Sequence, residues 1–274
     1  MIRKFVPAAV KRAVRRFQEA RRRASLFGPL APLVPPVADM YEGPAGLDEF
    51  KANGDEFLAI YKNLCGLRPD ERMLDVGSGI GRKTIPLTQY FNASAVYEGI
   101  DISKAGIDWC QRRITARYPN FRFTLLDVRN DLYNPSGRNE ASEVRFPFAN
   151  ESFTFVMLGS VFTHMKPRDV EHYLHEINRV LAAGQRCLIS YFLLNDESRS
   201  LIDAGRSTLP FGATLDDFAT TSPDMPESAI AYEETFIRSL YARTGFTIAR
   251  MEYGTWCGRA EGLSYQDLIV ATKT

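Results

Sequence analysis

The sequence predicts an α/β protein in which helices cover both faces of a parallel β-sheet. From residue 49 onward, short apolar strands alternate with segments whose apolar residues recur at helical spacing. Parallel strands need long crossover connections, usually helices, so this alternation is typical of a parallel sheet. A glycine-rich turn follows the first predicted strand, at the carboxyl end where ligands of such sheets bind.

The predicted elements follow one another in a regular order. The first is a helix over residues 49–65, which ends at the stop signal Gly66. Ser103 is a good N-cap for a helix that carries Ile107 and Ile114. The other predicted elements are a strand at 73–76, a helix at 82–91, strands at 93–102, 121–126 and 153–158, a helix at 169–181, a strand at 186–193, a helix at 233–244, and strands at 246–252 and 266–272.

Two segments fall outside this alternation. Residues 195–230 are rich in Asp, Ser, Thr and Pro and predict an insert of lid type. Four prolines between positions 29 and 36 favour an extended linker. The predicted division is therefore a basic amphipathic arm over 1–27, a Pro-rich linker over 28–45 and an α/β domain over 46–274.

Composition restricts the class of protein. Of the 274 residues, 45% are hydrophobic and 24% are charged, which is enough apolar material for a substantial core. The four cysteines are far apart, with no C-x-x-C pair and no histidine at metal-binding spacing. This pattern argues against a disulfide scaffold or a metal site and favours a reducing compartment. No apolar run approaches the roughly 20 residues that cross a bilayer, so we expect a cytoplasmic protein.

The overall charge of +1 hides an asymmetry. Residues 1–25 contain nine basic residues and one acid, a net +8, which leaves 25 basic and 32 acidic residues, a net −7, for the rest. Apolar residues recur in this segment at spacings near three and four, which predicts an amphipathic helix that begins close to Pro7; they are Ile2, Val6, Val10, Val14, Phe17 and Ala24.

Three interpretations of this arm remain open from the sequence. It is a solvated arm, an interfacial helix whose cations meet anionic lipid, or an organelle transit peptide. The segment contains few serines, which argues against the interpretation as a transit peptide. The second interpretation implies peripheral contact of residues 1–25 with a membrane.

The glycine-rich turn has a specific spacing. Residues 75–82 read D-V-G-S-G-I-G-R, which fits neither a dinucleotide fingerprint nor a phosphate loop, because Arg82 stands where the third glycine is needed and no glycine-lysine pair follows. Glycines permit positive φ and let a ligand approach the backbone. Asp75 lies in the first predicted strand, and Asp101 and Asp127 end the next two. The sequence therefore predicts three carboxylates along one rim of the sheet.

These motifs resemble those of the class I S-adenosylmethionine-dependent methyltransferases, a Rossmann-like family whose signature is an acid followed by alternating glycines after the first strand. The similarity covers most of residues 49–274. It implies a seven-stranded sheet in the order 3-2-1-4-5-7-6 with the seventh strand antiparallel. It also implies methyl transfer with S-adenosyl-L-methionine as the cofactor. The family usually has an acid where Thr154 stands, so no carboxylate role is carried over there.

The resemblance implies a role for each matching residue. The loop would hold the methionine portion of the cofactor, and Asp101 would bind the ribose hydroxyls. Asp127 would accept a hydrogen bond from the adenine amino group. The implied cofactor-binding residues are Asp75, Gly77, Ser78, Gly79, Gly81, Asp101, Ile102, Asp127 and Val128.

His164 is the candidate catalytic residue. It follows the fourth predicted strand, at the same rim as the acids, and an imidazole titrates in the range suited to proton abstraction. A general base helps by a factor of about 10²–10⁴ if the acceptor is a hydroxyl, whereas an amine or an acidic phenol does not require one. The alternatives are that His164 caps the helix near Asp169 or shapes the cofactor pocket.

The sequence therefore predicts a methyltransferase that acts on a heteroatom, first of all a hydroxyl oxygen, of a small molecule or saccharide. One alternative is a lipid or quinone methyltransferase at a membrane surface, and another is a non-catalytic cofactor-binding regulatory or assembly protein. Nucleic acid is not expected, because residues 158–161 read L-G-S-V instead of an Asn/Asp-Pro-Pro-aromatic run, and because the chain beyond the arm is acidic.

Overall fold

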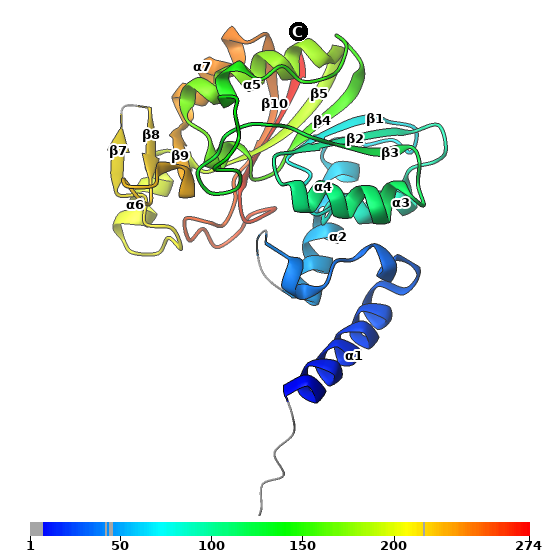
Figure 1. The fold of residues 1–274 in the computed structure, drawn as a ribbon. Coiled ribbons are helices and arrows are strands. Elements are labelled where there is room, and N and C mark those ends of the chain that lie inside the picture. The colour runs from blue at the N-terminus through cyan, green and yellow to red at the C-terminus, as the bar shows by residue number, and fades with distance from the viewer. Residues whose placement is uncertain (1–7, 42, 44–45, 216) are drawn as a thin grey trace, which may run out of the picture.

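A seven-stranded β-sheet forms the centre of the fold (Figure 1). The structure is a computed structural model and describes residues 8–41, 43, 46–215 and 217–274. The strands of this sheet are β1 (Arg72–Val76), β2 (Val96–Asp101), β3 (Phe121–Leu125), β4 (Phe153–Leu158), β5 (Leu181–Tyr191), β10 (Phe246–Glu252) and β11 (Asp267–Lys273). Their order across the sheet is β3-β2-β1-β4-β5-β11-β10. β11 is antiparallel to both of its neighbours, so the predicted order and the antiparallel seventh strand are confirmed.

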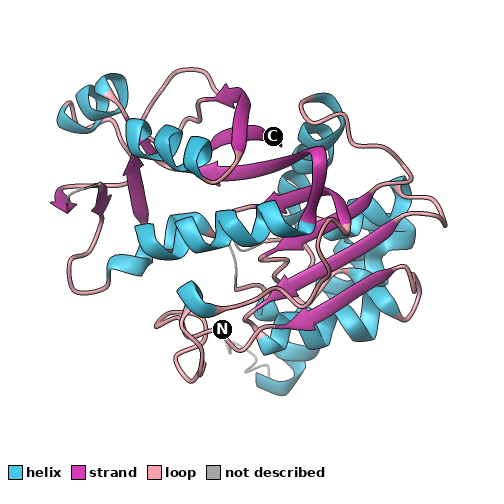
Figure 2. Ribbon diagram, turned by 90° about the horizontal axis from the view of Figure 1, so that it is seen from above, coloured by secondary structure: helices cyan, strands magenta, loops and turns pink. Residues whose placement is uncertain are grey.

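Helices cover both faces of this sheet (Figure 2). One face packs against α2 (Leu47–Asn63), α3 (Thr84–Tyr90) and α4 (Lys104–Cys110), and the other against α5 (Pro167–Val180) and α7 (Glu234–Arg243). Side chains alternate between the two faces of a strand. Accordingly, Met73 of β1 belongs to the hydrophobic cluster on the side of α2, α3 and α4, and Leu74 belongs to the cluster on the side of α5 and α7. Ser103 is the N-cap of α4, as predicted, and its hydroxyl oxygen accepts the N–H of Gly106 at 3.3 Å.

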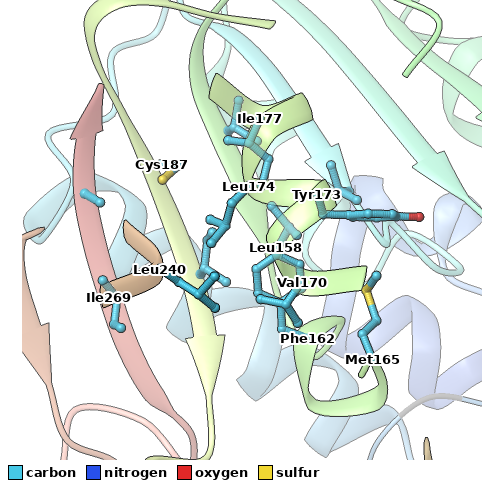
Figure 3. Close-up of a cluster of buried hydrophobic side chains, with 14 of the residues drawn as sticks. Leu158, Phe162, Met165, Val170, Tyr173, Leu174, Ile177, Cys187, Leu240 and Ile269 are labelled. Carbon is cyan, nitrogen blue, oxygen red and sulfur yellow. The ribbon is translucent and has the colours of Figure 1, made fainter. Parts of the chain in front are cut away.

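The core beneath α5 is apolar and fully buried (Figure 3). Val170, Leu174 and Ile177 lie one helical turn apart and face the sheet, where Cys187 of β5 and Ile269 of β11 meet them. All five side chains are inaccessible to solvent. Burial of this stripe orients α5 and thereby positions the turn that precedes it.

The boundary between α5 and β5 differs from the prediction. The sequence places a helix end near Leu181 and the next strand from Arg186, whereas β5 begins at Leu181. Leu181 pairs with Phe153 and Arg186 pairs with Phe155, so the residues between them bulge out of the ladder. Gly184 adopts a φ of 69° inside this bulge, where the sequence placed it at a helix end.

The segment over residues 195–230 contains secondary structure of its own. It holds α6 (Asp196–Asp203), β7 (Ala213–Leu215), β8 (Phe218–Thr220) and η6 (Pro226–Ser228). With β6 (Leu193–Leu194) and β9 (Ile230–Glu233), its strands form a second sheet in the order β6-β9-β8-β7. A separate cluster that includes Phe211 and Trp256 lies beside this sheet. We call residues 195–230 the insert; its function as a lid stays a prediction.

The extended conformation predicted for the Pro-rich linker over 28–45 is wrong over residues 28–39, and part of the linker, residues 42, 44 and 45, lies outside the described residues. The chain forms two short 3₁₀ helices, η1 (Gly28–Leu33) and η2 (Val37–Asp39). Proline is compatible with the first turn of a helix, and Leu33 and Val34 between the prolines are fully buried. The indole N–H of Trp109 also donates to the Leu33 carbonyl at 2.9 Å. Burial of apolar side chains therefore folds this segment onto the domain, while the boundaries at residues 27 and 45 stay predictions.

The basic arm is helical within its described part. Helix α1 covers Ala8–Phe27 and projects from the domain (Figure 1). Ile2 and Val6 of the predicted apolar face lie outside the described residues. Of the helices in the described ranges, none combines the length and the apolar character needed to span a bilayer.

A buried carboxylate joins the amino ends of β1, β4 and β5. Glu71 is fully buried, and its Oε2 lies 2.8 Å from Nη2 of Arg186. The Thr154 hydroxyl, where the family usually has an acid, donates to Oε1 of Glu71. Burial by itself raises the pKa of Glu71, but the hydrogen bonds from Arg186 and Thr154 outweigh it and leave the pKa below its ordinary value.

Replacement of Arg186 by Met should remove the nearer and more buried of the two cations at this carboxylate, leaving only Arg68, which is 58% exposed and lies 3.6 Å from Oε1. We expect Arg186→Met to lower the free energy of unfolding by about 3–5 kcal/mol in urea titrations at neutral pH. The control Arg129→Met breaks a pair in which both side chains are exposed, at 57% and 64%, and should cost less than about 1 kcal/mol.

The difference between wild type and Arg186→Met should also depend on pH. Because the folded pKa of Glu71 lies below its unfolded value, its contribution is full above the unfolded pKa and fades as the pH falls through the folded pKa. Equal losses in the Arg186 and Arg129 variants at neutral pH would contradict this account.

Candidate functional site

The loop after β1 has backbone angles that glycine adopts easily. Gly77, Gly79 and Gly81 have φ angles of 82°, 54° and 88°, in the left-handed region. A Cβ on Gly77 would overlap the side chain of Val161, which follows β4. Glycine is therefore required in this loop both by the positive φ angles and by the close approach of Val161 to Gly77.

The Asp101 carboxylate joins this loop to the end of β2. Its Oδ2 accepts the N–H of Gly79, and its Oδ1 accepts the N–H of Ser103, both at 2.7 Å. A carboxylate oxygen has two lone pairs and can accept more than one hydrogen bond. The structure thus places Asp101 next to the glycine loop at the predicted rim, half-buried between it and the start of α4.

Asp75 lies beneath the loop. Only 1% of its surface is exposed, and its Oδ2 accepts the hydroxyl of Tyr97 at 2.6 Å. The Tyr97 oxygen is also 2.8 Å from the Thr84 hydroxyl at the start of α3. Burial and the nearby Asp75 charge raise the pKa of Tyr97, which therefore stays protonated and donates to Asp75. This chain of contacts supports the loop from the side of the sheet.

Asp127 follows the end of β3, at the same rim. Its carboxylate accepts the backbone N–H and the guanidinium of Arg138, and these contacts lower the pKa of Asp127. Arg138 is 85% exposed. A cleft of about 280 Å³ opens beside Asp127 and is bounded by Leu126, Asn139 and Val144, among others. Sequence reasoning missed Arg138, because it lies in an irregular stretch eleven residues downstream.

The two apolar residues predicted to flank the cofactor adjoin these acids. Ile102 follows Asp101 and is half-buried, and Val128 follows Asp127 and is 3% exposed. Both belong to the hydrophobic cluster on the α5 side of the sheet. Ser78 lies between the loop glycines and is 5% exposed.

His164 lies in the short 3₁₀ helix η5 (Phe162–His164) that follows β4. Its Nδ1 is 2.8 Å from the carbonyl oxygen of Glu227 in the insert. Because a carbonyl oxygen only accepts, Nδ1 carries the hydrogen, and the lone pair is on Nε2. Burial lowers the pKa of His164 and favours its neutral form. The N-cap of α5 is Lys166, without a side-chain bond, so the alternative in which His164 caps this helix is wrong.

Glu227 connects the insert to the rim. Its Oε2 accepts the side-chain amide of Asn130 at 3.0 Å, and its Oε1 is 3.8 Å from Nζ of Lys166. The ring of Tyr133 also packs edge-on against His164, with centroids 5.5 Å apart. The insert, the loop after β3 and η5 therefore meet at His164. Nothing in the local sequence pattern marks Glu227, because its partners are more than 60 residues away.

A second polar network lies at the carboxyl ends of β4 and β5. Ser160 has a φ of 63°, which is rare for a residue with a Cβ and marks backbone strain. Its N–H donates to the Ser190 hydroxyl oxygen at 2.8 Å. The hydroxyls of Ser190 and Ser160 both donate to Oε1 of Gln266, at 2.7 and 3.0 Å. Tertiary folding brings these three residues together over 106 positions of sequence.

The segment before the domain also reaches the loop. A Cβ on Gly106 would overlap the Tyr41 hydroxyl and would lie 2.6 Å from the Gly79 carbonyl oxygen. The guanidinium of Arg82, directly after the loop, lies 5.0 Å from the centre of the Phe50 ring in α2. The sequence offers no signal for the position of Tyr41, because it depends on how residues 28–41 fold.

Comparison with known proteins supports the fold and the domain assignment. Residues 73–184 match the family model described as methyltransferase domain. Magnesium protoporphyrin IX methyltransferase from Synechocystis PCC 6803, solved with bound SAH, is 17% identical, with 94% of each chain covered and a TM-score of 0.53. The PH0226 protein from Pyrococcus horikoshii OT3 is 16% identical, with 84% of this chain and 93% of that chain covered and a TM-score of 0.56.

A further structural match is a geranyl diphosphate C-methyltransferase from Streptomyces coelicolor A3(2), solved with Mg2+, geranyl diphosphate and S-adenosyl-L-homocysteine. It is 13% identical, with 81% of this chain and 79% of that chain covered and a TM-score of 0.51. At these identities, the three structures show that the fold is shared.

Loss of the Asp101 carboxylate should weaken binding of S-adenosylhomocysteine. We expect Asp101→Ala to raise the dissociation constant at least about tenfold in isothermal titration, because it removes hydrogen bonds to a charged acceptor. Gly79→Val should do the same, since a Cβ-branched side chain disfavours its positive φ. Asp108→Ala is the control, because Asp108 pairs with Lys104 on the outer surface of α4. Unchanged affinity in the first two variants would contradict the site.

Proposed function

We propose that this protein is a class I S-adenosylmethionine-dependent methyltransferase whose acceptor is a hydroxyl oxygen of a small molecule or saccharide. The match of residues 73–184 to a methyltransferase domain, together with the fold, supports the first part of this proposal. The observation that carries this proposal is the tautomer and the protonation state of His164. A neutral imidazole with its lone pair on Nε2 follows β4, at the rim that also bears the glycine loop and Asp101. Such a group suits the removal of a hydroxyl proton.

The described residues fit the cofactor. The glycine loop has bare backbone at three positive-φ positions, and the Asp101 carboxylate lies directly beside it. In this proposal Gly77, Ser78, Gly79 and Gly81 hold the methionine portion, with Asp75 supporting them from below. Asp101 accepts the ribose hydroxyls, Ile102 and Val128 pack beside the adenine, and Asp127 accepts its amino group while it stays paired with Arg138.

When bound, S-adenosyl-L-methionine supplies an activated methyl group on a sulfonium. The protein therefore needs to align the acceptor and keep water out. His164 takes the acceptor proton on Nε2 as the new bond forms. The Glu227 carbonyl holds Nδ1–H, keeps the ring in this tautomer and stabilises the imidazolium that results.

The network of Ser160, Ser190 and Gln266 is proposed to bind the polar part of the acceptor. Ser160 is exposed at the end of β4, and Gln266 holds it by a hydrogen bond. The insert contacts His164 through Glu227 and thus borders the same space. Hydroxyl and amide groups at this edge favour an acceptor that itself carries hydroxyls, such as a saccharide.

A second candidate is a lipid or quinone acceptor at a membrane surface. It is favoured by the exposed apolar residues of α1, of which Phe17 is 64% exposed. A carbon acceptor is a third outcome, since one similar structure is that of a C-methyltransferase.

Transfer of labelled methyl from S-adenosylmethionine into a cell extract separates these candidates. Label in the water-soluble small-molecule fraction, on an oxygen atom identified by mass spectrometry, is expected. Label in the organic extract supports the lipid acceptor, and label on carbon overturns the heteroatom assignment.

Replacement of His164 by Gln should remove the pH dependence of methyl transfer at acidic pH. In the wild type, kcat should fall as the pH drops through the depressed pKa of His164, because protonation removes the base. We expect His164→Gln to lower kcat about 10²–10⁴-fold and to abolish this acidic limb. The control His175→Gln changes an exposed residue of α5 and should preserve the profile. Wild-type turnover in His164→Gln would exclude it as the base.

Replacement of Gln266 by Leu tests the acceptor network. Gln266→Leu should raise KM for the acceptor by about tenfold, as one hydrogen bond to a polar acceptor is lost, and should leave the affinity for S-adenosylhomocysteine unchanged. Gln89→Leu, on the surface of α3, is the control. A loss confined to cofactor affinity would refute the assignment of Gln266 to the acceptor.

A further inference from the structure

Helix α1 has an apolar face that is open to solvent. Val10 and Val14 are each 48% exposed and Phe17 is 64% exposed. Their spacing of four and three residues places them on one side of the helix. Exposed large apolar side chains gathered on one face mark an interaction surface more often than isolated ones do.

This apolar face is distinct from the face that packs on the domain. The packing face contains Glu19, which accepts the N–H of Val37 at 3.1 Å, and Arg23, which pairs with Glu19. It ends at Phe27, whose ring lies 6.2 Å from that of Phe50 in α2. At 100° per residue, the packing face and the apolar face lie roughly 150° apart around the helix axis. The contacts of the packing face therefore leave the apolar face pointing away from the domain.

Cations flank the apolar face. Helix α1 holds seven basic residues and a single acid, Glu19, which is already paired with Arg23. The guanidinium of Arg21 lies 5.8 Å from the centre of the Phe17 ring, so a cation adjoins the most exposed apolar residue. The other basic residues are Lys11, Arg12, Arg15, Arg16, Arg22 and Arg23. Of these, Arg22 pairs with Asp48 in α2 and Arg23 with Glu19, so both are held towards the domain.

We propose that α1 docks this protein on an anionic lipid surface. The helix lies in the interface, with Val10, Val14 and Phe17 at the boundary of the acyl chains and its arginines at the lipid phosphates. The charge of α1 is complementary to anionic headgroups. The apolar face selects lipid over nucleic acid, because a phosphate backbone requires cations but no exposed apolar stripe. This inference goes beyond the proposed function and holds for any acceptor.

Docking through α1 also affects the orientation of the site. Phe27 at the end of α1 packs on Phe50, and Phe50 carries the guanidinium of Arg82, which directly follows the glycine loop. The docked helix is thus joined to the cofactor rim by three packed side chains. A lipid surface beneath α1 would hold this rim at a defined orientation to the bilayer.

The test is co-sedimentation of the full chain with vesicles of phosphatidylcholine alone or mixed with phosphatidylglycerol. We expect binding to the mixed vesicles only. The variant Val14→Ser/Phe17→Ser should reduce this binding by about tenfold, because its apolar contribution is lost while every cation remains. The control Leu263→Ser changes a residue that is 49% exposed elsewhere and should bind as the wild type does.

Three outcomes would overturn the proposal. They are absence of binding to the mixed vesicles, equal binding by wild type and Val14→Ser/Phe17→Ser, and self-association of the wild type that this variant abolishes in sedimentation velocity. The last outcome would assign the apolar face to a second copy of the chain. Titration with S-adenosylhomocysteine serves as the folding control, since neither substituted residue contacts the site. Failure of docking therefore leaves the proposed methyl transfer open to its own test.

Discussion

The carboxylate of Asp101 is the contact on which the site depends. It accepts backbone N–H groups from Gly79 and Ser103, and so joins the glycine loop, the end of β2 and the start of α4 through one side chain. Hydrogen bonds to a charged acceptor are stronger than those between neutral groups, and here they hold a loop of left-handed glycines in one conformation. The same carboxylate is the proposed ligand of the cofactor ribose. Support of the loop and binding of the ligand would therefore be functions of one residue.

The rim is completed by contacts from far along the chain. The insert brings the Glu227 carbonyl to Nδ1 of His164, and burial keeps this imidazole neutral. At the ends of β4 and β5, Gln266 of the loop before β11 accepts the hydroxyls of Ser160 and Ser190. Because β11 is antiparallel to β5, its start lies at the carboxyl ends of the parallel strands. The unusual direction of one strand thus contributes a polar group to the rim.

The insert and helix α1 extend from the central domain, and each is proposed to have a different role. The insert extends from the end of β5 with its own small sheet and contacts the rim through Glu227. Helix α1 projects from the domain (Figure 1) and meets it through Phe27. The segment after α1 packs on the domain through the fully buried Leu33 and Val34. Small-molecule chemistry at the rim and attachment to a lipid surface would therefore be separable by mutation.

Local sequence determined the strands and helices of the central sheet and the glycine loop, because alternation of apolar residues, a capping serine and a run of glycines act over a few neighbouring positions. It also indicated Asp101 and Asp127, since each lies at the carboxyl end of a predictable strand. Only the tertiary structure decided that Arg138 pairs with Asp127, that Glu227 sets the tautomer of His164 and that Gln266 holds Ser160. It also decided that residues 28–41 fold against the domain. These contacts join positions that are distant in sequence or lie in irregular segments, where burial and hydrogen bonding across elements outweigh local propensity.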